Sequence, residues 1–203
     1  MPRHPKQTVL HHPPWPLKSW RGFMTAYRNR TCALGGDGHL LLQALGQCAP
    51  RLLQFKGLPV SISDQLPQSY LRFVGRYGSV PLPEWTGHWR LLTPDEVGPF
   101  SELEPELVES WASVDASAES ESVYSDYSDG PNSYFRASDL RATIQISSIG
   151  DGEYVLLLNP CVRFSNGEWE AWMLGNTIPG VLRFPSFRDL MDVQLNELAL
   201  MAM

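Results

Sequence analysis

The side chains able to act as nucleophiles or metal ligands are few in this chain. There are three cysteines and five histidines, and three of the histidines lie within the first 12 residues. Cys32, His39 and Cys48 are close together, but their spacing matches no zinc-binding pattern and supplies no fourth ligand. Neither a G-x-S-x-G elbow nor the signature of a protease cysteine is present. We therefore expect no catalytic residue and no metal site.

Glycine-rich and acidic turns are present, but none has the pattern of a ligand-binding loop. Residues 35–38 and 150–152 lack the Lys-Ser/Thr pair of a P-loop and the G-x-G-x-x-G spacing of a dinucleotide site. In a calcium loop aligned on Gly130, Tyr127 falls at the third position, where an oxygen ligand is required. The sequence therefore predicts no cofactor.

Charge is distributed unevenly along the chain, although the formal net charge is only −6. Residues 1–60 contain eight basic residues and one acid, whereas residues 61–203 contain eight arginines and 21 acids. From Asp95 to Asp129 there are eleven acids and no Lys or Arg. Nucleic acids and anionic membranes need basic residues to neutralise their phosphates, so we expect neither as a partner. The charge favours a basic protein instead.

Aromatic residues are interleaved with these acids, and the combination suits a contact surface. Tyrosines can supply contact energy, while carboxylates steer a basic partner and repel others. The alternative is a solvated loop that keeps the protein soluble. For the contact surface we select nine partner-binding residues: Glu102, Glu106, Glu109, Glu119, Glu121, Tyr124, Asp126, Tyr127 and Asp129.

The start of the chain has no helical or strand pattern. It is rich in proline and histidine, so we expect residues 1–35 to be a disordered leader, and Met24 is an alternative start. No stretch approaches the ~20 apolar residues of a membrane span, and three cysteines without a C-x-x-C pair favour reduced thiols. We expect a cytoplasmic protein.

Apolar residues at helical spacing predict several helices. The clearest is started by Asp64 and Pro67, and its Tyr70, Phe73, Val74 and Tyr77 form one apolar stripe before Gly78. Other helices are predicted at residues 37–49, after a capping box at 93–96, at 105–111, and from a second capping box at Ser186 and Asp189.

Alternating and apolar runs predict strands at residues 88–92, 143–147, 154–158 and 168–173. Asn159-Pro160 should end the third of these. Strands grouped together and flanked by helices predict an α+β fold with a largely antiparallel sheet. We expect one domain over residues 36–203, with an acidic insert at about 115–133.

The order of these motifs resembles the SUKH superfamily, the Smi/Knr-type domain. Residues 66–78 are similar to its LP-x-x-Y-x-x-F-x-x-x-x-G helix, and residues 89–97 to its following strand and helix. Residues 144–159 look like its hairpin, 167–169 like its G-E-V strand start with Trp as the third residue, and 186–191 like its S-F-x-E-(F/L)-L helix with Asp for Glu. The likeness spans about residues 55–195, but the acidic insert and the leader have no counterpart in it.

The resemblance implies a binding scaffold without catalysis, as in bacterial immunity proteins and fungal cell-wall regulators. The most specific expectation is an immunity protein that neutralises a cognate, basic toxin protein by occluding its active site. A regulatory scaffold that recruits cellular partners stays open as an alternative. An enzyme is the remaining alternative, and it would need a pocket that gathers His39 or His88 with carboxylates.

Overall fold

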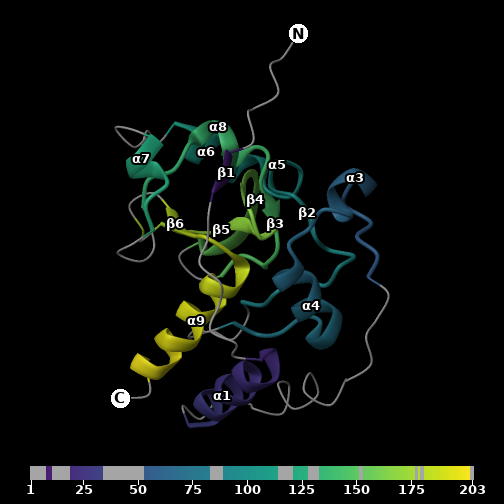
Figure 1. Ribbon diagram of the computed structural model, residues 1–203, viewed down its shortest axis with the longest axis vertical. Helices are drawn as coiled ribbons and strands as arrows, with labels where there is room; N and C mark the ends of the chain where they lie inside the picture. Colours follow the sequence, from purple (N-terminus) through teal and green to yellow (C-terminus); the bar gives the residue numbers. More distant parts are fainter. Residues whose placement is uncertain are drawn as a thin grey trace.

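Helices lie on both faces of a central β-sheet, which gives the chain an α+β fold as expected (Figure 1). The computed structural model describes residues 8–10, 19–33, 53–82, 89–113, 121–127, 133–150, 153–176, 178 and 181–201. Its helices are α1 (Trp20–Ala33), α3 (Val60–Ser63), α4 (Gln68–Tyr77), α5 (Phe100–Leu103), α6 (Pro105–Ala112), α7 (Glu121–Tyr124), α8 (Ala137–Leu140) and α9 (Phe187–Met201). None of these helices is long and apolar enough to cross a membrane.

The strands follow a simple order. They are β1 (Thr8–Leu10), β2 (Gly98–Pro99), β3 (Ile144–Gln145), β4 (Val155–Phe164), β5 (Trp169–Leu174) and β6 (Val181–Phe184). Strands β2 to β6 pair antiparallel in that order, and β1 pairs in parallel with the end of β4. The largely antiparallel sheet expected from the sequence is therefore confirmed.

Strand β4 continues through Asn159-Pro160 to Phe164, so the expectation that it ends there is wrong. Its pairing with β5 shifts register between Asn159 and Arg163. Proline is tolerated at such a bulge because no ladder hydrogen bond needs its missing N–H. The shift also turns Val162 and Phe164 towards the residues that pack around α7.

Alternation along the strands divides the core into two layers. Leu156, Leu158 and Met173 face α1, α4 and α9 on the first face of the sheet. Leu157 and Trp172 face the opposite way, on the second face, where α5, α6 and α8 cover the sheet. Because both faces are covered, the strands are apolar almost throughout.

Helix α4 packs on the first face with the stripe that the sequence predicts. All four residues of that stripe are buried, and Gly78 follows the helix as expected. The helix begins after Pro67, which has no side chain able to cap it. Instead Glu168, just before β5, accepts hydrogen bonds from the Ser69 N–H at 3.0 Å and from the Ser69 Oγ at 2.5 Å. A carboxylate there satisfies a free N–H and complements the helix dipole.

Helix α1 belongs to the same core, and it corrects the expectation of a disordered leader over residues 1–35. Phe23, Met24 and Tyr27 are 2%, 0% and 2% exposed. Their spacing places them on one side of the helix, and the Phe23 ring packs edge-on against Phe73 of α4. A chain that began at Met24 would lack that ring.

The capping box predicted at Thr93 forms, but the chain turns there. The Thr93 N–H and Oγ1 both donate to Glu96 at 2.8 Å, and Arg90 donates to the same carboxylate at 2.7 and 2.8 Å. The chain then enters β2 at Gly98 and Pro99. Gly98 precedes a proline, and a residue in that position avoids the helical backbone conformation. The prediction of a helix directly after the capping box is therefore wrong.

The other predicted elements have mixed outcomes. Helix α6 confirms the helix at 105–111, and α9 confirms the closing helix. The strand expected at 88–92 is reduced to isolated β-bridges, formed by Arg90 and Leu91. The helix expected at 37–49 lies outside the described residues. Strand β6 was not among the predicted strands, since four residues with one charge among them form too short a pattern.

Replacing Phe23 by alanine tests the contribution of α1 to the core. The free energy of unfolding should fall by about 3–5 kcal/mol, through lost burial and the cavity left behind. Urea denaturation followed by tryptophan fluorescence measures this loss. Arg21→Ala, at an exposed position of the same helix, is the control and should change the free energy by less than about 0.5 kcal/mol. Equally small effects in both variants would contradict the placement of α1 in the core.

The Thr93 turn should respond to acid. The hydrogen bonds from Arg90 lower the pKa of Glu96 from 4.5 to about 2. Because the folded-state pKa is the lower one, the carboxylate stabilises the fold above pH 4.5, and this contribution is lost as the pH falls towards 2. Glu96→Gln should therefore be less stable at neutral pH, by about 0.5–1 kcal/mol since the pair is partly exposed. Urea titrations across the acid range should show the difference shrinking; a constant difference would contradict this account.

Candidate functional site

A buried pair of opposite charges lies on the second face of the sheet. Glu170 belongs to β5 and Arg183 to β6, and both side chains are 0% exposed. Strand alternation places them there, because Trp172 and Val181 lie two residues away and face the same helical layer. Side chains from α7 and the residues after it meet at this pair.

Four donors surround the Glu170 carboxylate. Arg183 Nη1 and Trp172 Nε1 each donate at 2.5 Å, and Asn159 Nδ2 donates at 3.0 Å. The fourth donor is Tyr127 Oη, from the residues that follow α7. A full set of donors that includes a guanidinium offsets the penalty of burying a charge.

Arg183 connects this carboxylate to α7. Its Nη2 donates to the backbone oxygen of Tyr124, and its guanidinium lies 3.6 Å from the centroid of the Tyr124 ring. The guanidinium of Arg136 lies 3.9 Å from the same ring. Contacts of this kind between a guanidinium and an aromatic face are attractive, and more so when they are desolvated. The Tyr124 ring is therefore bound to two arginines.

Both tyrosines keep their protons at neutral pH. Burial raises the pKa of Tyr124 and of Tyr127 above the ordinary tyrosine value, and the negative charge of Glu170 raises it further. Each hydroxyl is thus a potential donor, and the Tyr127 hydroxyl donates to Glu170. The arrangement stabilises α7 against the sheet.

The other titratable groups beside the pair are unsuited to nucleophilic chemistry. Burial, with the negative charges of Asp139 and Glu170, raises the pKa of the Cys161 thiol from 9.0 to about 11. Such a thiol is protonated at neutral pH and reacts slowly. Burial also raises the pKa of Asp139. In the part of the chain that is described, no three His, Cys, Asp or Glu side chains are grouped so that they could hold a metal ion.

Four of the carboxylates selected from the sequence lie exposed on or just after the helices over the second face. Glu102 is on α5, Glu106 and Glu109 are on α6, and Asp126 follows α7. We call these four residues the acidic surface. Helix α6 turns its carboxylates outward because Val108 packs inward against the sheet.

The remaining selected residues have different positions. Glu119 and Asp129 lie outside the described residues, and Glu121 begins α7. Tyr124 is 2% exposed and Tyr127 is half-buried. The structure therefore corrects the role expected for the two tyrosines. They hold α7 on the sheet, because their rings and the Tyr127 hydroxyl contact residues of their own chain.

Glu170 and Arg183 were not among the residues that the sequence pointed to. One signal was present, since each is a charged residue within an apolar strand, and an inward-facing charge needs a partner. Which partner it has depends on β6, whose Arg183 pairs in register with Trp172. That register comes from tertiary pairing and has no local pattern.

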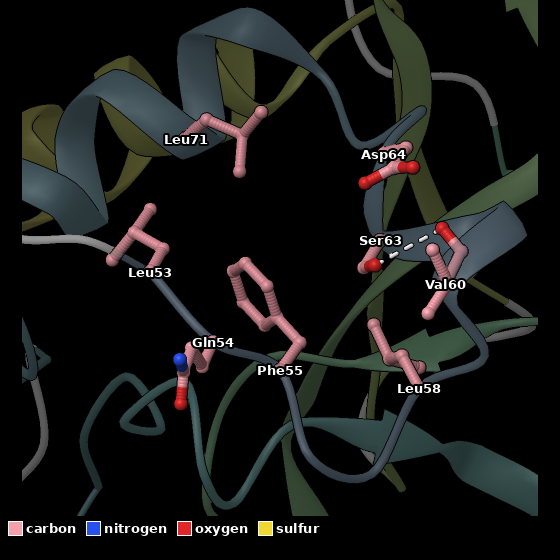
Figure 2. A pocket seen from close by; sticks show the side chains of 8 residues that line it. All are labelled: Leu53, Gln54, Phe55, Leu58, Val60, Ser63, Asp64 and Leu71. Carbon is pink, nitrogen blue, oxygen red and sulfur yellow. Dashed lines mark hydrogen bonds between the residues drawn. The ribbon is translucent and has the colours of Figure 1, made fainter.

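A separate hollow of about 580 Å³ lies between α3, α4 and residues 53–58 (Figure 2). None of the partner-binding residues selected from the sequence lines it. The lining residues are Leu53, Gln54, Phe55, Leu58, Val60, Ser63, Asp64 and Leu71. Its walls are mainly apolar, so it suits an apolar group better than a charged one.

Comparisons with known proteins add no relative to this chain. No family model matches it, and no curated protein or solved structure matches it either. The resemblance to the SUKH superfamily therefore rests on the sequence motifs alone.

Replacing Arg183 by methionine tests the buried pair. The change leaves Glu170 as an unpaired buried charge, so the free energy of unfolding should fall by about 3–5 kcal/mol. Urea denaturation measures it. The matched control is Arg141→Met, which breaks the exposed ion pair between Arg141 and Glu109 and should cost at most about 1 kcal/mol. Similar losses in the two variants would contradict the role of Arg183.

Proposed function

We propose that this protein is a non-catalytic module that binds a basic protein through the acidic surface. The observation that carries the proposal is the exposure of four carboxylates, Glu102 on α5, Glu106 and Glu109 on α6, and Asp126 just after α7. Carboxylates gathered in this way attract a cationic partner over a distance and raise its association rate. They also disfavour anionic partners.

The local balance of charge supports this proposal. Among the described residues, Glu102 and Glu106 form no ion pair. Of the nearby arginines, Arg141 donates to Glu109 at 2.7 Å, and the Arg136 guanidinium lies over the Tyr124 ring. Arg141 therefore offsets one of these charges, while Glu102 and Glu106 keep theirs without an ion-pair partner in the described part of the chain.

Rigidity of the surface also supports the proposal. Helix α6 is held by Val108 and by Trp111, whose ring packs edge-on against Phe135. The stretch before Asp126 is held through Tyr124 by Arg183. Side chains on an ordered scaffold lose less conformational freedom on binding, so the entropic cost of binding is smaller.

The most specific form of the proposal is a SUKH-type immunity protein that neutralises a cognate toxin by occluding its active site. The order of the sequence motifs supports it. Three of the motifs coincide with α4, with β3 and β4, and with the start of α9, whereas the helix expected within residues 89–97 does not form. Many nucleases need a basic surface to hold phosphate, so an inhibitor of a nuclease gains from a negative one. The toxin is therefore expected to be basic.

Reversing the charge of the acidic surface tests the proposal. In the triple variant Glu102→Lys, Glu106→Lys, Asp126→Lys, association with a basic partner should slow by about tenfold or more, because electrostatic steering is reversed. The assay is co-expression with the product of each neighbouring gene that arrests growth on its own. The original protein should restore growth, whereas the triple variant should fail to do so.

The control carries the same change in net charge at other places. Asp95→Lys, Glu153→Lys, Asp192→Lys alters three carboxylates that lie outside the acidic surface, and it should restore growth. Circular dichroism establishes that both triple variants are folded. Rescue by the acidic-surface variant at the original level would rule out this surface as the binding site. If no neighbouring gene product arrests growth on its own, the immunity role would be contradicted.

A further inference from the structure

We infer that the hollow between α3, α4 and residues 53–58 is an anchor pocket for the partner, and that it takes an apolar side chain with a basic residue beside it. The inference rests on the proposed function, because it assumes that the partner is a basic protein. It adds a second point of contact, of different chemistry, to the acidic surface.

The size and walls of the hollow fit an apolar side chain. Its volume is about 580 Å³, within the range of about 300–1,000 Å³ that is usual for binding pockets. Figure 2 shows Leu71 from α4 and Leu53 around the same space as the Phe55 ring. Phe55 and Leu58 are almost fully buried, so packing against the rest of the protein holds these two lining side chains in place. An apolar group placed here would lose its contact with water and gain close packing.

The rim of the hollow indicates the charge of its occupant. Asp64 is the one ionisable side chain among the eight residues that line the hollow, and it is exposed. Within the described ranges it forms no ion pair. Ser63 Oγ donates to the Val60 backbone oxygen at 3.1 Å, so that hydroxyl proton is already used. A Lys or Arg next to the inserted side chain would match Asp64, whereas an acid would be repelled.

The segment that contributes part of the wall, residues 53–58, runs beside the segment that leads to Glu102. A Cβ added to Gly57 would lie 2.5 Å from the Val97 oxygen, so residues 53–58 run directly against the start of β2. Strand β2 leads without a break into α5. Two apolar side chains near these segments are exposed: Val60 of α3 is 74% exposed and Leu103 of α5 is 42% exposed. A partner side chain bound in the hollow would therefore lie beside the segment that leads to Glu102.

The inference is tested with two short peptides rather than with a partner. Acetyl-Leu-Arg-amide and acetyl-Leu-Glu-amide are titrated into protein with ¹³C-labelled leucine and valine methyl groups. The Leu-Arg peptide should shift the methyl signals of Leu53, Leu58 and Leu71, and the Leu-Glu peptide should bind about fivefold more weakly. Asp64→Asn should remove the difference between the peptides. Leu71→Trp, which fills the hollow, should abolish binding of both.

Several results would overturn the inference. These are equal affinity of the two peptides for the original protein, an unchanged preference in Asp64→Asn, and methyl shifts confined to other residues. Asp64 is exposed, so its variant keeps the test valid if Leu71→Trp fails to fold. The Glu102→Lys, Glu106→Lys, Asp126→Lys variant should bind the Leu-Arg peptide within about twofold of the original. Loss of growth rescue in that variant, without peptide binding at the hollow, would leave the proposed function standing and remove the anchor pocket.

Discussion

The ion pair between Glu170 and Arg183 is the interaction on which the second face of the sheet depends. Two charges without solvent exposure are tolerated only when they are paired and their remaining hydrogen-bonding groups are largely satisfied. Here Trp172, Asn159 and Tyr127 supply further donors to the carboxylate. Each of these side chains is therefore constrained in direction as well as in position. An apolar pair of the same size would fill the space without imposing such directions.

This constraint reaches the surface through α7. Tyr124 and Tyr127 come from the most acidic part of the sequence, yet both contact the buried arginine, and Tyr127 also donates to Glu170. The aromatic residues thus serve the interior, while Asp126 between them is exposed. The short segment from Tyr124 to Tyr127 is therefore held on the sheet by its two tyrosines and presents the Asp126 carboxylate to solvent. A binding surface for a basic protein needs these two properties together, since steering requires charge and specificity requires a fixed arrangement.

The two faces of the sheet have different roles in this account. On the first face, α1, α4 and α9 form the larger apolar core, and Glu168 holds the start of α4 with hydrogen bonds. On the second face, the helices are short and carry the acidic surface. The hollow lies beside α4, and its wall runs against the segment that leads into α5. The inferred anchor pocket therefore lies on the side of α4, next to the segment that connects to the acidic surface.

Local patterns in the sequence were enough to predict the α+β class, α4 with its stripe, the capping boxes, the first part of β4 and most of β5. Each depends on residues a few positions apart, whose spacing decides which face they share. Tertiary structure alone decided that α1 joins the core, that β6 completes the sheet, and that the tyrosines point inward. Tyr127 meets Glu170 across 43 residues, and Arg183 meets Tyr124 across 59. Contacts over such separations form only when strand register and helix packing bring the residues together, so they leave no period in the chain.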